Sequence, residues 1–158
     1  MVLGPVLAET PLVLDTNILT AWRVDSVLVA AAIVDYQSRS KLTPALTAFT
    51  VHEALYGVEN TIAKAGRLDD RTKQDRVAIK LLIDSCVVAP FDQRAAEISA
   101  YMIPRLKKNI PKESLLDALI AATALAHGYG VATRDRGFER IAENTPDNMV
   151  LRLAFWSV

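Results

Sequence analysis

Four acidic side chains stand where apolar stretches of the chain begin or end: Asp15, Glu53, Asp117 and Asp135. Ionised carboxylates that lie close together raise one another's pKa, so such a group needs a counter-charge. Carboxylate oxygens and water are the ligands that Mg²⁺ and Mn²⁺ prefer. One cysteine and two distant histidines offer no zinc-type spacing. The pattern therefore favours a site for one or two ions of Mg²⁺ or Mn²⁺.

Each of the four acids also has a purely structural interpretation. Asp15 alone could cap the N-terminus of a helix, and Asp135, two residues before Gly137, could form a turn. Glu53 and Asp117 each hold the last position of a capping-box pattern, Thr-x-x-Glu and Ser-x-x-Asp. The functional interpretation therefore depends on all four acids occurring in order, each near the boundary of an element.

Short apolar runs and the helical patterns between them indicate the elements that must position these acids. We expect strands at about 11–14, 45–50, 86–89, 131–133 and 149–155. We expect helices after Asn17 and at about 27–34, 50–60, 92–108 and 114–127, and a protruding helical hairpin at 61–85. Strands separated by helices indicate a parallel sheet with helices on both faces. Ligand sites in such sheets lie beyond the carboxyl ends of the strands.

Length and composition limit the class of protein. A chain of 158 residues with 51% hydrophobic residues predicts one folded domain over 1–158, with 1–10 as a loose leader. Equal numbers of basic and acidic residues, 18 of each, argue against binding nucleic acid through net charge. The longest run without Asp, Glu, Lys or Arg, at 118–133, is too short for a membrane span. The single cysteine fits a reducing compartment, so we expect a cytoplasmic protein with no membrane association.

Four strings of residues together resemble a known family. They are LDTNIL at 14–19, Glu53 followed by Tyr56-Gly57, DALIAATALAHG at 117–128 and VATRDRGF at 131–138. In this order they resemble the PIN-domain nucleases, above all the VapC-type ribonuclease toxins of bacterial toxin–antitoxin pairs. The resemblance spans about 12–155. It implies a three-layer α/β/α sandwich with a mostly parallel sheet of about five strands and a protruding helical hairpin.

The resemblance also implies roles for individual residues. The catalytic and metal-binding residues would be Asp15, Glu53, Asp117 and Asp135. Supporting residues would be Thr16 and Asn17, which shape the strand-to-helix turn, and Thr133, whose hydroxyl would hydrogen-bond within the acidic group. Many relatives have Asn at the position of Asp135, so this chain has a more acidic version of the site.

The implied activity is metal-dependent endonucleolytic hydrolysis of phosphodiester bonds in RNA by a homodimeric toxin. The implied partner is a cognate, VapB-like antitoxin that silences the toxin by placing a basic side chain near the acids. Because an acidic site repels phosphate, RNA must be held by nearby cations. Candidate RNA-binding residues are Arg134, Arg136, Arg105, Lys107 and Lys108.

Three other functions fit parts of the pattern. One is a PIN-family RNA-processing nuclease that has no antitoxin, and another is a PIN-like module that binds RNA or protein without cutting. The presence of all four acids argues against the second. A receiver domain phosphorylated on aspartate would need adjacent acids after the first strand, whereas Thr16 and Asn17 follow Asp15.

Overall fold

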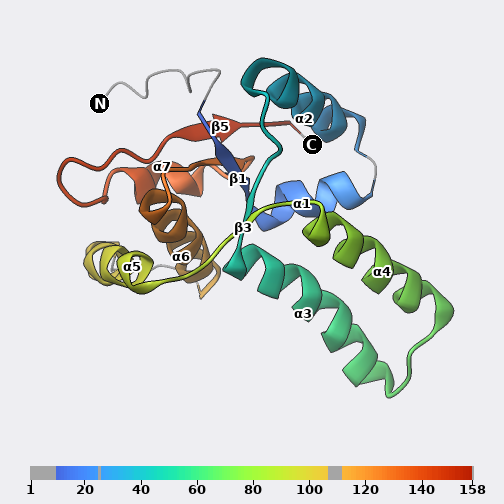
Figure 1. Cartoon of the computed structure of the whole chain (residues 1–158). Coiled ribbons are helices and arrows are strands. Elements are labelled where there is room, and N and C mark those ends of the chain that lie inside the picture. Colours follow the sequence, from blue (N-terminus) through green and yellow to red (C-terminus); the bar gives the residue numbers. More distant parts are fainter. Residues whose placement is uncertain (1–9, 25, 107–111, 158) are drawn as a thin grey trace.

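A parallel β-sheet forms the centre of the molecule. The computed structural model describes residues 10–24, 26–106 and 112–157, with the side chains of 112–114 left out. β1 (Leu12–Leu14), β4 (Gly130–Thr133) and β5 (Leu153–Phe155) form one parallel ladder, and β2 (Leu46–Thr47) pairs in parallel with β3 (Val88–Ala89). A parallel bridge between Val13 and Ala45 joins the two ladders. The prediction of five strands in a parallel arrangement is confirmed (Figure 1).

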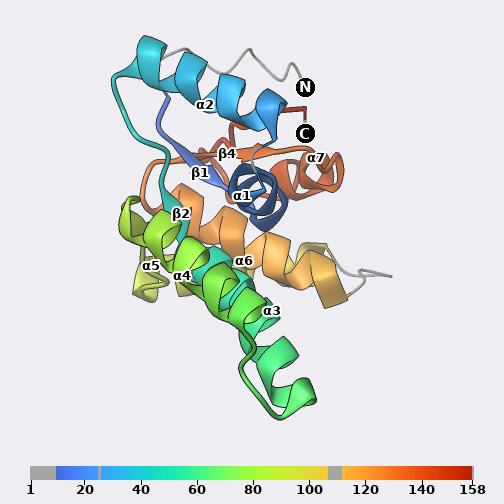
Figure 2. The ribbon, with the colours of Figure 1, turned by 90° about the vertical axis from the view of Figure 1, so that its right-hand side faces the viewer.

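Helices cover both faces of this sheet, because successive residues of a strand point to opposite sides. Leu12 and Leu14 of β1 pack into one core, and Val13 packs into the other. The first core includes residues of α1 (Thr16–Arg23), α2 (Val27–Ser40), α3 (Ala48–Ala65) and α4 (Asp70–Asp84). The second includes residues of α5 (Gln93–Arg105), α6 (Lys112–Ala126) and α7 (Gly137–Ala142). The expected three-layer sandwich is confirmed, and Figures 1 and 2 show its two helical layers.

The expected helical hairpin is formed by α3 and α4 and extends away from the sheet (Figures 1 and 2). α3 ends at Gly66, which adopts the left-handed conformation (φ 66°) that glycine tolerates best. Asp69 caps the start of α4, and its carboxylate accepts a hydrogen bond of 2.8 Å from the Thr72 amide. The hairpin begins earlier than predicted, because α3 runs without a break from Ala48.

The start of α3 also corrects the expected capping box. The cap is Thr47, whose hydroxyl accepts a hydrogen bond from the Thr50 amide at 3.2 Å. Thr50 lies inside the first turn, and its hydroxyl donates to the Leu14 carbonyl at 3.2 Å. Glu53 is therefore not the partner of a capping Thr50. α6 likewise begins at Lys112, before the Ser114 that was expected to cap it.

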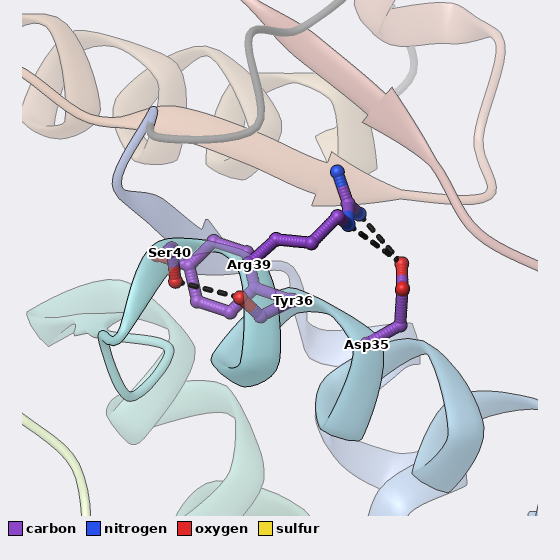
Figure 3. Close-up of polar contacts among 4 residues, drawn as sticks. All are labelled: Asp35, Tyr36, Arg39 and Ser40. Carbon is purple, nitrogen blue, oxygen red and sulfur yellow. Dashed lines mark hydrogen bonds and ion pairs between the residues drawn. The ribbon is translucent and has the colours of Figure 1, made fainter.

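α2 is joined to the start of β1 through Tyr36, whose buried hydroxyl accepts a hydrogen bond of 3.1 Å from the Leu12 amide. The helix continues to Ser40, beyond its predicted end, and the Ser40 hydroxyl donates to the Tyr36 carbonyl at 2.7 Å. On the exposed side of α2, Arg39 pairs with Asp35 at 2.6 Å (Figure 3). This ion pair therefore belongs to the helix that is held at the start of β1, whereas Asp15 follows the end of that strand.

Among the described residues, no single helix is both long and apolar enough to cross a bilayer. Within the same residues, α1 and α2 taken together reach that length and composition, but they meet at an angle of 109°. The expected leader falls outside the described residues except for Thr10.

Candidate active site at the carboxyl edge of the sheet

Asp15 lies directly after β1 with only 3% of its surface exposed. Its carboxylate caps α1, where Oδ1 accepts a hydrogen bond of 2.9 Å from the Ile18 amide. Its Oδ2 accepts a hydrogen bond from the hydroxyl of Thr133, at the end of β4. Asp15 therefore caps α1, and its carboxylate also contacts the end of the neighbouring strand β4.

Thr133 connects Asp15 to Asp135. The Thr133 side chain is fully buried, and its hydroxyl accepts a hydrogen bond of 2.9 Å from the Asp135 amide. The exposed Asp135 in turn accepts a hydrogen bond of 2.7 Å from the Gly137 amide. A Cβ atom at Gly137 would lie only 3.0 Å from Asp135 Oδ1, so glycine lets the loop close tightly around this carboxylate. The Thr133 hydroxyl thus donates to the Asp15 carboxylate and accepts from the Asp135 amide, and its role in an active site stays a prediction.

The electrostatic state of Asp15 reflects its surroundings. Burial raises the pKa of Asp15, and the negative charge of Asp135 raises it further. Hydrogen bonds from Thr133 and from the Ile18 and Asn17 amides lower it, but the net direction is upward. The fold therefore holds a carboxylate whose charge is unfavourable without a counter-ion, which is the condition that a bound cation relieves.

Glu53 lies in the second turn of α3, the helix that follows β2. Its Oε2 accepts a hydrogen bond from the hydroxyl of Thr16, the residue next to Asp15. Thr16 thus connects the second acid of the chain to the turn that carries the first. The sequence suggested Thr16 only as part of that turn, because nothing local indicates a partner 37 residues away.

Asp117 lies in the first half of α6 and is half-buried. Residues three, four and seven positions further along, Ile120, Ala121 and Ala124, are fully buried, so Asp117 continues the inner face of the helix. α6 ends just before β4 begins, which directs its first half toward the carboxyl edge of the sheet. Asp117 therefore lies on the side of the sheet, and toward the carboxyl edge, where the Thr133 hydroxyl contacts Asp15.

The donor chemistry fits a hard divalent cation, although the side chains do not form a closed cage. Among the described residues, no three His, Cys, Asp or Glu side chains lie close enough together to share one ion. Mg²⁺ usually keeps several of its waters and takes only one or two carboxylates from the protein. Asp15 and Asp135, coupled through their charges and through Thr133, offer such a pair.

The predicted RNA-binding cations differ in their surroundings. Arg134 and Arg136 flank Asp135 and are exposed. Arg105 lies 3.5 Å from the centre of the Tyr101 ring and donates to the Tyr101 carbonyl at 2.8 Å, so it is held against its own helix. The other two candidates, Lys107 and Lys108, lie outside the described residues.

A hollow of about 250 Å³ next to the site was not foreseen from the sequence. It lies between α1, α3 and α4, and both Thr16 and Glu53 line it. Arg23 and Asp75, also in its wall, form an ion pair of 3.2 Å between α1 and α4. No local signal could have indicated this hollow, because its walls come from three helices that only the tertiary fold brings together.

We expect Thr133→Val to weaken binding of Mn²⁺ about 10- to 100-fold, because groups that orient metal-binding carboxylates have effects of this size. Valine has a similar shape but cannot donate to Asp15 or accept from the Asp135 amide. Isothermal titration with Mn²⁺ would measure the change. Thr133→Ser, which keeps the hydroxyl, is the matched control. Equal affinities of the valine variant and the wild type would contradict the positioning role.

Comparisons with known proteins agree with this geometry. The family model of the PIN domain matches residues 12–144. The chain is 32% identical over 125 residues to the VapC ribonuclease Y4jK of Sinorhizobium fredii, covering 78% of this chain and 86% of that protein. The fold is similar to DNA-bound VapBC from Salmonella typhimurium (TM-score 0.70, 20% identity, 94% of this chain and 99% of that one). It is also similar to FitAcB from Neisseria gonorrhoeae (TM-score 0.55, 28% identity, 82% and 92%).

Proposed function

The chain belongs to the PIN-domain family and, within it, to the VapC ribonucleases, and from this we propose that it is the toxin of a type II toxin–antitoxin pair. Its activity is Mg²⁺- or Mn²⁺-dependent endonucleolytic hydrolysis of RNA, and a cognate antitoxin inhibits it. Support for the partner comes from solved relatives of the same fold, which are VapBC and FitAB complexes.

One observation carries the catalytic part of this proposal. Asp15 and Asp135, from the ends of two adjacent parallel strands, are connected by the buried hydroxyl of Thr133. The raised pKa of Asp15 means that the folded protein holds this carboxylate in surroundings that disfavour its charge. Such an arrangement destabilises the metal-free protein and is typical of sites built for a ligand.

We assign the metal-binding role to Asp15, Glu53, Asp117 and Asp135. When bound, a divalent cation supplies positive charge for the scissile phosphate and a nucleophilic water near neutral pH. Thr133 fixes the orientation of Asp15, and Thr16 fixes that of Glu53. Asp135, the exposed member of the set, is the acid best placed to orient the attacking water. Arg134 and Arg136 offset the repulsion between these acids and the RNA backbone.

The hollow between α1, α3 and α4 is where we place the inhibitory segment of the antitoxin. Its wall combines apolar side chains with two carboxylates, Glu53 and Asp75, of which Asp75 is already paired with Arg23. A basic side chain entering the hollow would pair with Glu53 and compete with the cation for that carboxylate. The antitoxin would thus inhibit by occupying one of the acids that the reaction needs.

The test of the function is cleavage of total cellular RNA by purified protein stripped of any bound partner. We expect discrete cuts with Mg²⁺ or Mn²⁺ and none with EDTA. An Asp117→Asn variant should bind the metal more weakly and should not cut. Expression of the wild type should arrest growth, and expression of Asp117→Asn should not. Metal bound by an intact wild type that leaves RNA uncut would favour the non-catalytic module instead.

The homodimer implied by the family resemblance stays a prediction. Sedimentation velocity of the isolated chain would test it, with a single species of monomer mass as the contrary result.

A further inference from the structure

Phe155 brings an aromatic ring to the same edge of the sheet as the acids. It is the last residue of β5 and pairs in register with Thr133 of β4. Residues in register on neighbouring strands point to the same side of a sheet. Phe155 therefore points to the side on which the Thr133 hydroxyl meets Asp15, and its side chain is only half-buried.

The guanidinium group of Arg136 is stacked on this ring. Its central carbon lies 3.8 Å from the centre of the Phe155 ring. One nitrogen of the group donates to Glu139 at 2.8 Å, so the guanidinium group has a ring contact at its central carbon and a carboxylate contact at one nitrogen. The Arg136 side chain is nevertheless 68% exposed. The structure thus presents an exposed cation with a ring contact and a carboxylate contact one residue after Asp135.

We propose that the exposed face of the Arg136–Phe155 stack binds an unpaired base of the RNA substrate beside the acidic site. The inference rests on the proposed ribonuclease function and adds a determinant for single-stranded RNA to it. Unpaired bases stack on aromatic side chains and on arginine planes, whereas bases inside a duplex have both faces covered. Ordering by Phe155 and Glu139 also reduces the side-chain entropy that Arg136 loses on binding.

The arrangement favours a base over a phosphate as the partner of Arg136. Phosphate recognition by arginine uses the edge of the guanidinium fork, with two parallel hydrogen bonds. In Arg136, part of that edge is already used by Glu139, and the group already lies over an aromatic ring. A lysine at this position would keep the charge but could not stack, which separates the two kinds of contact experimentally.

The experiment measures the binding of a fluorescent oligoadenylate by anisotropy, in Mg²⁺, with Asp117→Asn in every protein so that the RNA is not cut. The second ligand is an abasic strand of the same length, which has the same phosphates and no bases. The variants are Arg136→Lys and Phe155→Leu, with Arg39→Lys as the matched control. Arg39 is also an exposed arginine paired with a carboxylate, but it lies on α2 and has no ring contact among the described residues (Figure 3).

We expect both test variants to lose about tenfold or more in affinity for oligoadenylate and to bind the abasic strand as their parent does. The control should bind both ligands unchanged. Oligoadenylate bound equally well by Arg136→Lys and its parent would overturn the inference, as would a parent that binds both ligands equally. Cleavage of total RNA by Arg136→Lys, without the Asp117 change, is assayed in parallel. If Arg136→Lys cleaves RNA and also binds oligoadenylate as its parent does, the inference about base binding is overturned and the ribonuclease function stands. If none of the proteins cleaves or binds RNA, the ribonuclease function is overturned as well.

Discussion

Replacing Asp15 with Asn should abolish RNA cleavage and make the stability of the metal-free protein less dependent on pH. The loss of activity follows from the loss of a metal-binding carboxylate, since a bound cation contributes several kcal/mol to stabilising the reacting phosphate. Cleavage should therefore slow by roughly a thousandfold or more. The change in pH dependence follows from the raised pKa of Asp15, because its charge is disfavoured in the folded state and the amide carries none. Asparagine caps helices as well as aspartate does, so α1 keeps its start.

The pH dependence of stability has a definite sign. An acid whose pKa is higher in the folded state binds more protons there than in the unfolded chain. The stability of the metal-free wild type should therefore fall as the pH rises from the usual pKa of 3.8 through the raised pKa of Asp15. Asp15→Asn should remove this decline, because the amide does not titrate.

Urea unfolding in EDTA across this pH range, together with the RNA cleavage assay, would check both parts. Asp92→Asn is the matched control, because Asp92 caps α5 in the same way as Asp15 caps α1. Asp92 lies away from the site, since it contacts His127, which follows the end of α6 opposite to Asp117. The control should cleave RNA like the wild type. An Asp15→Asn protein that still cleaves RNA would contradict the site, and one whose stability falls with rising pH as that of the wild type does would contradict the electrostatic argument.

The second large effect is stabilisation by metal. At a Mn²⁺ concentration about 100 times its Kd, binding to the folded state alone adds about 2.7 kcal/mol to the free energy of unfolding. For a chain of this size, each kcal/mol raises Tm by about 2–4 °C, so the expected shift is about 5–10 °C. The cation relieves the repulsion between Asp15 and Asp135, which adds to the physical reason for the shift.

Differential scanning calorimetry with Mn²⁺ and with EDTA would measure this shift. Asp15→Asn and Asp117→Asn should lose most of it. Asp35→Asn should keep all of it, because Asp35 is paired with Arg39 on the exposed side of α2 (Figure 3). A wild type whose Tm does not respond to Mn²⁺ would count against the metal site, and equal shifts in all variants would place the ion elsewhere.

Much of the fold could be predicted from the sequence because its signals are local. The strand positions came from short apolar runs, and the helix positions came from the helical patterns between them. The first residue of α3 was wrong, because Thr47 and Thr50 are both good caps and the choice depends on which hydroxyl reaches Leu14. α7 was not foreseen, since it has only six residues and its apolar side chains are held by the core.

The sequence by itself determined which acids are present and in what order, because apolar runs and helical patterns place Asp15, Glu53, Asp117 and Asp135 near predicted strands and helices. Only the tertiary structure decided what each acid contacts. Thr133 and Asp15 are 118 residues apart, Thr16 and Glu53 are 37 apart, and the contact of Arg136 with Phe155 depends on the register of β5 against β4. Hydrogen bonds and stacking act over a few ångströms, so such partners become known only when the packing of the strands and helices brings them together.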